Sequence, residues 1–232
     1  MKTLIKITLL LLISFKSLGQ QNPVAQHGQI FCLSPVPATV NRVNGMCLGI
    51  GHNWSDYKPK TINGLNIEVN PATPIMVLFL DPDRIDHDSL QTTVNGLHLS
   101  TGGLSGNVKL NGAGVSAFNI CYASNGFSVT GLYNAATTLK GVHISGLQNS
   151  AVKGRGLLIA AMNLTEDFKG VSVGAYNQSI ITKGLEIGVL NLNKTQMSGV
   201  QIGIFNKAGR CKGLQIGLWN MNDKRSFPFI NW

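Results

Sequence analysis

The chain has 232 residues, of which 44% are hydrophobic and only 12% are charged, and its formal net charge is +9. This length suits one domain with a substantial core. The basic residues are dispersed and are not interleaved with aromatic residues, which argues against a nucleic-acid partner.

The first segment reads as a secretory signal peptide over residues 1–19. Lysines precede the apolar run Leu9–Phe15, and the small residues Ser17 and Gly19 occupy the expected positions of a cleavage site. The apolar run is too short to span a bilayer as a helix, and no later run reaches the roughly 20 residues required. The sequence therefore predicts export, a mature chain from about residue 20, and no transmembrane helix. The ending of this segment resembles signal peptides of Gram-negative bacteria, so we expect the periplasm, the outer membrane or the cell surface.

The mature chain, residues 20–232, is predicted to be a single β-repeat domain. Its irregular N-terminal part covers 20–112 and contains an insertion over 71–94, and regular repeats occupy 113–232. Within the irregular part, Asn-Gly pairs mark the starts of older repeat units, at residues 44–45, 63–64, 95–96 and 111–112. Export permits disulfides, and Cys32 with Cys47 is the nearest candidate pair in sequence.

The regular part is defined by an asparagine that returns every 14 or 15 residues. The series is Asn119, Asn134, Asn149, Asn163, Asn177, Asn191, Asn206 and Asn220. A short fixed period means that each unit is one structural rung that must stack on its neighbours. The asparagines are expected to be scaffold residues.

Most units begin with glycine and alternate at period two, which predicts a β-strand. One set of alternating positions is aliphatic: Leu185, Ile187, Val189, Val200, Ile202, Ile204, Leu214, Ile216 and Leu218. We expect this set to form the core, so Ile187→Asp or Ile202→Asp should prevent folding. The opposite positions carry a polar residue, then glycine, then usually a large apolar residue.

Two all-β architectures fit one strand per unit. In a β-solenoid or β-roll with rungs of 14–15 residues, equivalent positions stack directly and asparagine side chains bond to their copies above and below. In an up-and-down β-barrel, the unit ends would alternate between two rims. Identical ends at every unit favour the solenoid, whereas the aromatic C-terminus, Phe227–Trp232, is typical of outer-membrane barrels.

The units Gly-Leu-Gln-Ile-Gly-Leu-Trp-Asn and Gly-Val-Gln-Ile-Gly-Ile-Phe-Asn, and the ending Ser226–Trp232, resemble the bacterial surface-repeat family of exported proteins. The likeness covers residues 126–232. It implies export and association with the cell envelope, and it implies no catalytic residue because that family has no established activity.

The residue before each asparagine forms a second candidate feature, an apolar ridge. Its aromatic members are Phe118, Tyr133, Tyr176, Phe205 and Trp219, and the last four are the candidate contact face. Beside it runs a column, mostly of glycines, three residues before the asparagines. On a solenoid this pair of columns would form a shallow glycine channel with an apolar wall. Such a strip should be covered by the chain itself or by a partner: another envelope protein, a glycan or a second copy.

The acidic cluster Asp81, Asp83, Asp86 and Asp88, with His87 among them, could ligate calcium, although it lacks the EF-hand spacing. Otherwise no metal-ligand, nucleophile or phosphate-loop motif is present. We therefore expect a non-enzymatic, structural or adhesive envelope protein without a cofactor. The alternatives are a small outer-membrane barrel, and a glycan-active or calcium-binding protein that uses the acidic cluster.

Overall fold

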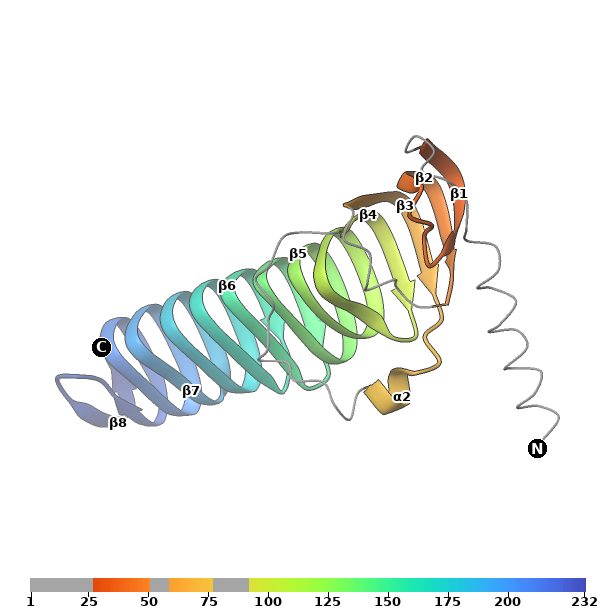
Figure 1. Cartoon of the computed structure of the whole chain (residues 1–232). Coiled ribbons are helices and arrows are strands. Elements are labelled where there is room, and N and C mark those ends of the chain that lie inside the picture. Colours follow the sequence, from red (N-terminus) through yellow and green to blue (C-terminus); the bar gives the residue numbers. More distant parts are fainter. Residues whose placement is uncertain (1–26, 51–58, 77–91) are drawn as a thin grey trace, which may run out of the picture.

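The computed structural model describes residues 27–50, 59–76 and 92–232, and these form one β-solenoid (Figure 1). The elements in chain order are β1 (His27–Ser34), β2 (Val40–Gly49), β3 (Lys60–Glu68), α2 (Thr73–Met76), β4 (Thr92–Ser100), β5 (Gly103–Ser145), β6 (Gln148–Ile159), β7 (Met162–Met221) and β8 (Ser226–Asn231). The predicted signal peptide and the acidic cluster 81–88 lie outside the described residues.

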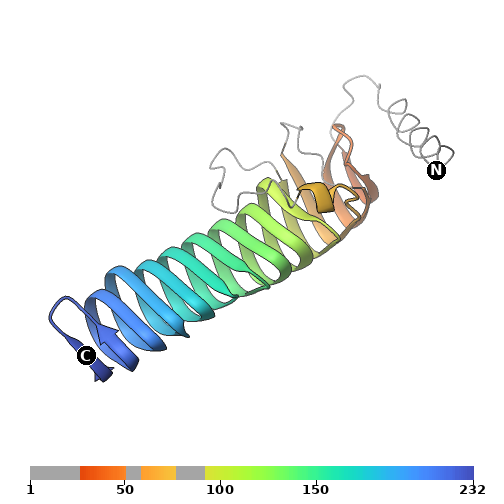
Figure 2. The same ribbon diagram turned by 90° about the horizontal axis from the view of Figure 1, so that it is seen from below.

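Successive rungs pair in parallel, from β1 with β2 through to β6 with β7. The register joins equivalent repeat positions, as in Tyr133 with Gln148 and then Met162. β5 and β7 are so long, 43 and 60 residues, because each runs through several rungs without interruption. This confirms the predicted solenoid and rules out the up-and-down barrel, whose neighbouring strands would be antiparallel. Figures 1 and 2 show the rungs stacked into a rod with β1 at one end and β8 at the other.

A column of glycines makes the turn that opens each rung. Its eleven described members have φ between 116° and 155°: Gly45, Gly64, Gly96, Gly112, Gly126, Gly141, Gly156, Gly170, Gly184, Gly199 and Gly213. From Gly64 onward, a Cβ would lie 1.9 to 2.2 Å from the carbonyl oxygen of the turn glycine on the preceding rung. Only glycine combines this backbone conformation with so close an approach. The Asn-Gly pairs of the irregular part share this register, which confirms that they start equivalent rungs.

The C-terminal end of the rod is covered by β8, which folds back antiparallel to the last rung and pairs Asn231 with Gln215. Pro228 lies within β8 and has no backbone N–H, so it weakens any further strand pairing at this edge. The sheet therefore ends in a strand that is poorly suited to continue it.

The interior changes character along the rod. In the N-terminal rungs it is mixed: Val43, Ile62, Val94, Leu110 and Leu139 are fully or almost fully buried, and so are the polar residues Asn66, Glu68 and His98. In the C-terminal rungs it is polar, because the repeat asparagines and the column Glu186, Gln201 and Gln215 are at most 1% exposed from Asn177 onward.

The assignment of the aliphatic positions to the core is therefore wrong. Ile187 and Ile202 are 37% and 40% exposed, and Leu218 is 62% exposed. We therefore no longer expect Ile187→Asp or Ile202→Asp to prevent folding, because both side chains lie on the surface. Alternation at period two separates two faces but does not say which is inside. Here the polar face is inside, because in-register amides satisfy one another from rung to rung.

Candidate interaction surface

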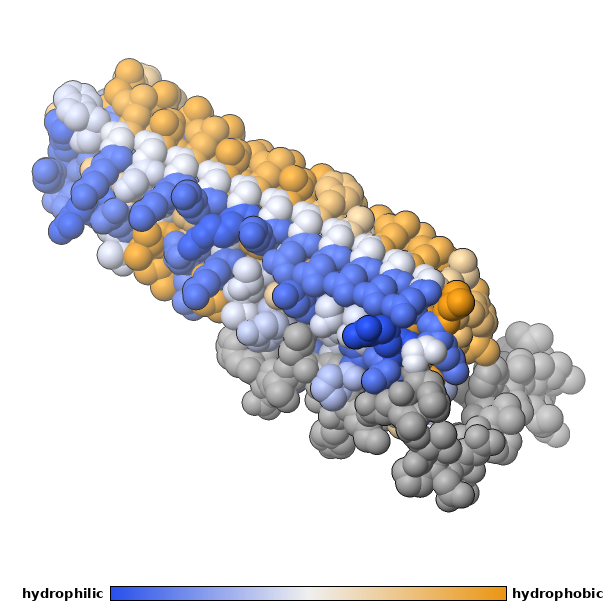
Figure 3. Space-filling view, turned by 90° about the horizontal axis from the view of Figure 1, so that it is seen from above, coloured by the Kyte–Doolittle hydropathy of each residue, from blue (hydrophilic) through white to orange (hydrophobic). Residues whose placement is uncertain are grey.

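The outer side of each rung's first strand carries the aliphatic residues, which stack into a continuous surface. We call this surface the aliphatic face; in the C-terminal rungs it comprises Leu185, Ile187, Val189, Val200, Ile202, Ile204, Leu214, Ile216 and Leu218. The same columns continue toward the N-terminus through Val115, Leu97 and Met46, all at least 37% exposed. Figure 3 shows the result as an apolar band along the rod, bordered by a pale line and then by a hydrophilic band. One of its borders follows from the sequence of each rung: it consists of the turn glycine and, before it, a polar or basic residue.

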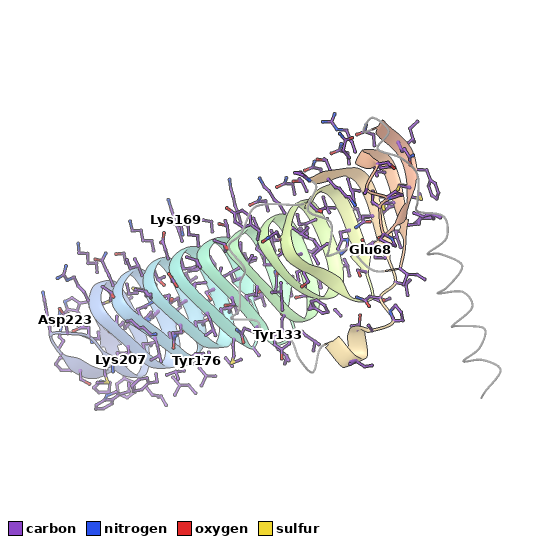
Figure 4. The ribbon with its side chains drawn as sticks, viewed as in Figure 1. Glu68, Tyr133, Lys169, Tyr176, Lys207 and Asp223 are labelled. Carbon is purple, nitrogen blue, oxygen red and sulfur yellow. The ribbon has the colours of Figure 1, made fainter. Side chains whose placement is uncertain are left out.

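The predicted aromatic ridge lies along the opposite border of the aliphatic face. Trp219 is exposed, at 46%, and Tyr133, Tyr176 and Phe205 are partly buried. Figure 4 shows Tyr133 and Tyr176 at the edge of the coil opposite Lys169. The ridge does not begin at Phe118, which is fully buried and packs with Ile120 and Ala135. The ridge is therefore the border of a wider apolar surface that sequence reasoning assigned to the core.

The expected glycine channel on the surface is also wrong. From Gly174 onward the glycines of this column face the interior, where a Cβ on Gly188 would lie 2.7 Å from Asn177 Nδ2 and 2.3 Å from the carbonyl oxygen of Gly174. The asparagine side chains occupy the space that the missing side chains leave. The glycine column thus serves the scaffold and offers no site to a ligand.

An asparagine ladder holds the C-terminal rungs together. Each Nδ2 from Asn149 to Asn206 donates to Oδ1 of the asparagine on the next rung at 2.8 to 2.9 Å. The same nitrogen also donates to a backbone carbonyl of that next rung at 2.9 to 3.1 Å. The ladder starts at Asn149 because the amide of Asn134 donates to Ser128 instead. The predicted scaffold role is thus confirmed for the asparagines from Asn149 to Asn220, which bond to their copies on adjacent rungs.

A second ladder runs beside it in the opposite sense. Asn231 donates to Gln215, Gln215 to Gln201, and Gln201 to Oε2 of Glu186. Glu186 Oε1 accepts further hydrogen bonds from the side chains of Thr182 and Asn193. A carboxylate suits the end of this chain of donors because it only accepts hydrogen bonds. Burial nevertheless raises the pKa of Glu186, against the lowering effect of these hydrogen bonds.

The buried Glu186 leads to a prediction on pH. A raised pKa in the folded state means that its contribution to stability is greatest below the ordinary value of 4.5 and declines as the pH rises above it. We expect the melting temperature of Glu186→Gln, relative to the unsubstituted protein, to increase between pH 4.5 and pH 8. For one titrating group, the difference in the free energy of unfolding changes by at most about 1.4 kcal/mol per pH unit. Circular-dichroism melts at several pH values measure this difference, and a difference independent of pH would contradict it.

Other titratable groups are buried in the interior and have no access to solvent. His143 is fully buried, its Nδ1 lies 2.7 Å from Ser128 Oγ, and burial lowers its pKa to about 4. Cys32 and Cys47 are free thiols on neighbouring rungs, in direct register. Burial raises the pKa of Cys47 to about 12. These groups serve packing, because a substrate could not reach them.

The predicted calcium cluster, Asp81 to Asp88, lies in the part of the chain that the structure leaves undescribed. Over residues 27–50, 59–76 and 92–232, no group of three His, Cys, Asp or Glu side chains is arranged to hold a metal ion. Over the same ranges, no helix is long and apolar enough to cross a membrane.

Comparison with known proteins adds no assignment. No family model matches the chain, and neither a curated protein nor a solved structure matches it.

Proposed function

We propose that this chain is a non-enzymatic protein of the cell envelope, exported through its N-terminal segment, with a structural or adhesive role. Its working part would be the aliphatic face together with the aromatic ridge of Tyr133, Tyr176, Phe205 and Trp219. The resemblance of the repeats to exported surface-repeat proteins supports the location. The polar groups of the C-terminal interior support the absence of catalysis, because from Asn177 onward the buried asparagines and the column Glu186, Gln201 and Gln215 satisfy one another inside a closed coil.

The observation that carries the proposal is the size of the exposed aliphatic face. The turn-glycine column has eleven members and so ten steps. At about 4.8 Å per step and three alternating residues across, the face measures about 50 by 13 Å, or about 600 Å². The largest apolar patch of a typical monomer is about 300–600 Å² and is often functional, and this face lies at the upper end of that range. A rigid rod that presents such a strip is suited to bind along an extended surface.

The test is fractionation of cells that express the full chain. We expect the protein in the envelope fraction of a Gram-negative host. The double variant Ile202→Asp/Ile216→Asp should fold but move mostly to the soluble fraction, because a charge on the exposed face opposes contact with an apolar partner.

The matched control is Ile180→Asp. Ile180 is 37% exposed, like Ile187, but it lies in the second half of its rung, away from the aliphatic face. We expect this variant to stay in the envelope fraction. A double variant that remains there as completely as the control would remove the aliphatic face from the function.

A further inference from the structure

A row of cations borders the aliphatic face across the turn glycines. The residue before the turn glycine is asparagine at the first five turn glycines, Gly45 to Gly126, where Asn63, Asn95, Asn111 and Asn125 each donate to the preceding asparagine. From the sixth turn glycine, Gly141, onward the same column reads Lys140, Arg155, Lys169, Lys183, Ser198 and Lys212. We call these five cations the basic column. The hydrophilic band beside the pale line in Figure 3 follows this border.

Among the described residues, few acidic side chains compensate the charge of the basic column. Members on adjacent rungs are spaced by about 4.8 Å, so their charges repel one another. Arg155 pairs with Asp167. Within the residues that the structure describes, Lys140, Lys169, Lys183 and Lys212 make no ion pair. Such a row is suited to an extended anionic partner, which would relieve the repulsion along its whole length.

The charge inventory argues against a second copy as that partner. The described residues include fourteen Lys or Arg but five Asp or Glu. Of the five acids, Glu68 and Glu186 are buried, which leaves Glu166, Asp167 and Asp223. Asp167 already pairs with Arg155. Over the residues that the structure describes, a second copy therefore offers no row of carboxylates to set against the basic column.

The area of the aliphatic face also argues against a second copy as the partner. Two copies packed through their aliphatic faces would bury about 1,200 Å² in total, twice the estimate for one face. This total is only at the lower limit for a specific, stable interface. A lipid surface has no such limit, because apolar side chains enter it individually and phosphate groups lie at its border.

The opposite border of the aliphatic face is of the kind that lipid interfaces favour. Tyr176, Phe205 and Trp219 lie along it, and Tyr and Trp are enriched where apolar lipid meets headgroups. Figure 4 shows Lys169 and Tyr176 at opposite edges of the coil, so the two borders flank one surface. An apolar strip with cations on one side and aromatic residues on the other has the composition of elements that lie in the bilayer interface.

We propose that the protein lies lengthwise on an anionic phospholipid bilayer, with its aliphatic face in the headgroup and upper acyl region and its basic column on the phosphates. This names the partner of the contact surface and so rests on the function proposed above. The rod binds the surface without crossing it. Affinity rises with the anionic lipid content and falls with salt, since exposed charges are screened.

The experiment is flotation of the purified full chain with vesicles of phosphatidylcholine alone and with one quarter phosphatidylglycerol. We expect binding to the anionic vesicles and much weaker binding to the neutral ones. Ile202→Asp/Ile216→Asp should lower the partition coefficient at least about ten-fold, while Ile180→Asp should not. Lys169→Gln/Lys183→Gln should lower it roughly 30-fold, or about five-fold for each cation. Melting curves confirm that each variant is folded.

A charge-matched control separates the basic column from general attraction. Lys194→Gln/Arg210→Gln removes the same charge from exposed residues in the second half of their rungs, and we expect a much smaller loss. Equal losses from the two pairs, or no flotation of the unsubstituted protein with anionic vesicles, would overturn the proposal. A stable dimer in sedimentation without lipid, dissociated by Ile202→Asp, would assign the face to a second copy. In each of these three outcomes, continued loss of the Ile202→Asp/Ile216→Asp variant from the envelope fraction would leave the proposed function standing.

Discussion

Asn191→Leu is expected to destabilise the protein severely, although leucine has a similar size and greater hydrophobicity. Asn191 is fully buried. Its substitution removes the acceptor of Asn177 Nδ2 and the donor to both Asn206 Oδ1 and the carbonyl of Ile202. Each buried polar group left without a partner costs about 1–3 kcal/mol. The sum, about 3–9 kcal/mol, is comparable with the whole stability of a typical domain.

The control for this variant is Asn44→Leu, the same change in the exposed ladder of the N-terminal rungs. Asn63 donates to Asn44 at 2.7 Å, but there water can take over the hydrogen bonds. We expect a change within about 0.5 kcal/mol. Urea unfolding followed by circular dichroism measures both variants. Equal effects would mean that the buried ladder contributes no more than the exposed one.

Gly203→Ala is the second substitution with a large expected effect. Its Cβ would lie 2.5 Å from the carbonyl oxygen of Gly188, 2.6 Å from Asn191 Nδ2 and 3.0 Å from Asn206 Oδ1. Two rungs would have to separate, or the asparagine ladder would have to break at this point. Overpacking usually costs about 1–3 kcal/mol, and we expect the upper end or more because backbone atoms are involved.

Gly131→Ala provides the comparison at the same repeat position, three residues before the repeat asparagine. A Cβ on Gly131 would meet its nearest atom, the carbonyl oxygen of Ala117, at an ordinary 3.6 Å. Alanine restricts the unfolded chain more than glycine does, so a small stabilisation, about 0.4–1 kcal/mol, is expected. Thermal melts of the two variants should move in opposite directions. A shared direction would show that interior crowding does not set the cost.

Most of the fold could be predicted from the sequence, because it follows from spacing. The interval between Asn177, Asn191 and Asn206 fixes the length of a rung, and the glycine before each strand fixes where the chain turns. The Asn-Gly pairs extend the register into the irregular part, as the pairing of Asn63 with Asn95 confirms. The location and the partners stay predictions. The role of the acidic cluster also stays a prediction, since that cluster lies outside the described residues.

The candidate surface was predicted in part. The ridge of Tyr176, Phe205 and Trp219 does border the contact surface proposed here, but the aliphatic face was placed in the core. One signal in the sequence favoured the correct assignment. Glu186, Gln201 and Gln215 share one repeat position, and side chains of this kind can be buried when they bond to their own copies on adjacent rungs. The usual preference for apolar interiors outweighed that signal.

The sequence by itself determined the period, the strands, the turn glycines and the stacking of equivalent residues, because these depend on local conformation and on the repeat. Only the tertiary structure decided which face of each strand is inside. The reason is that a polar interior becomes stable only when every amide meets a partner on the next rung, as from Asn177 to Asn191. That condition depends on the register between rungs, and one strand does not contain it. Because the polar face of each strand is inside, the aliphatic face and its basic border lie on the surface.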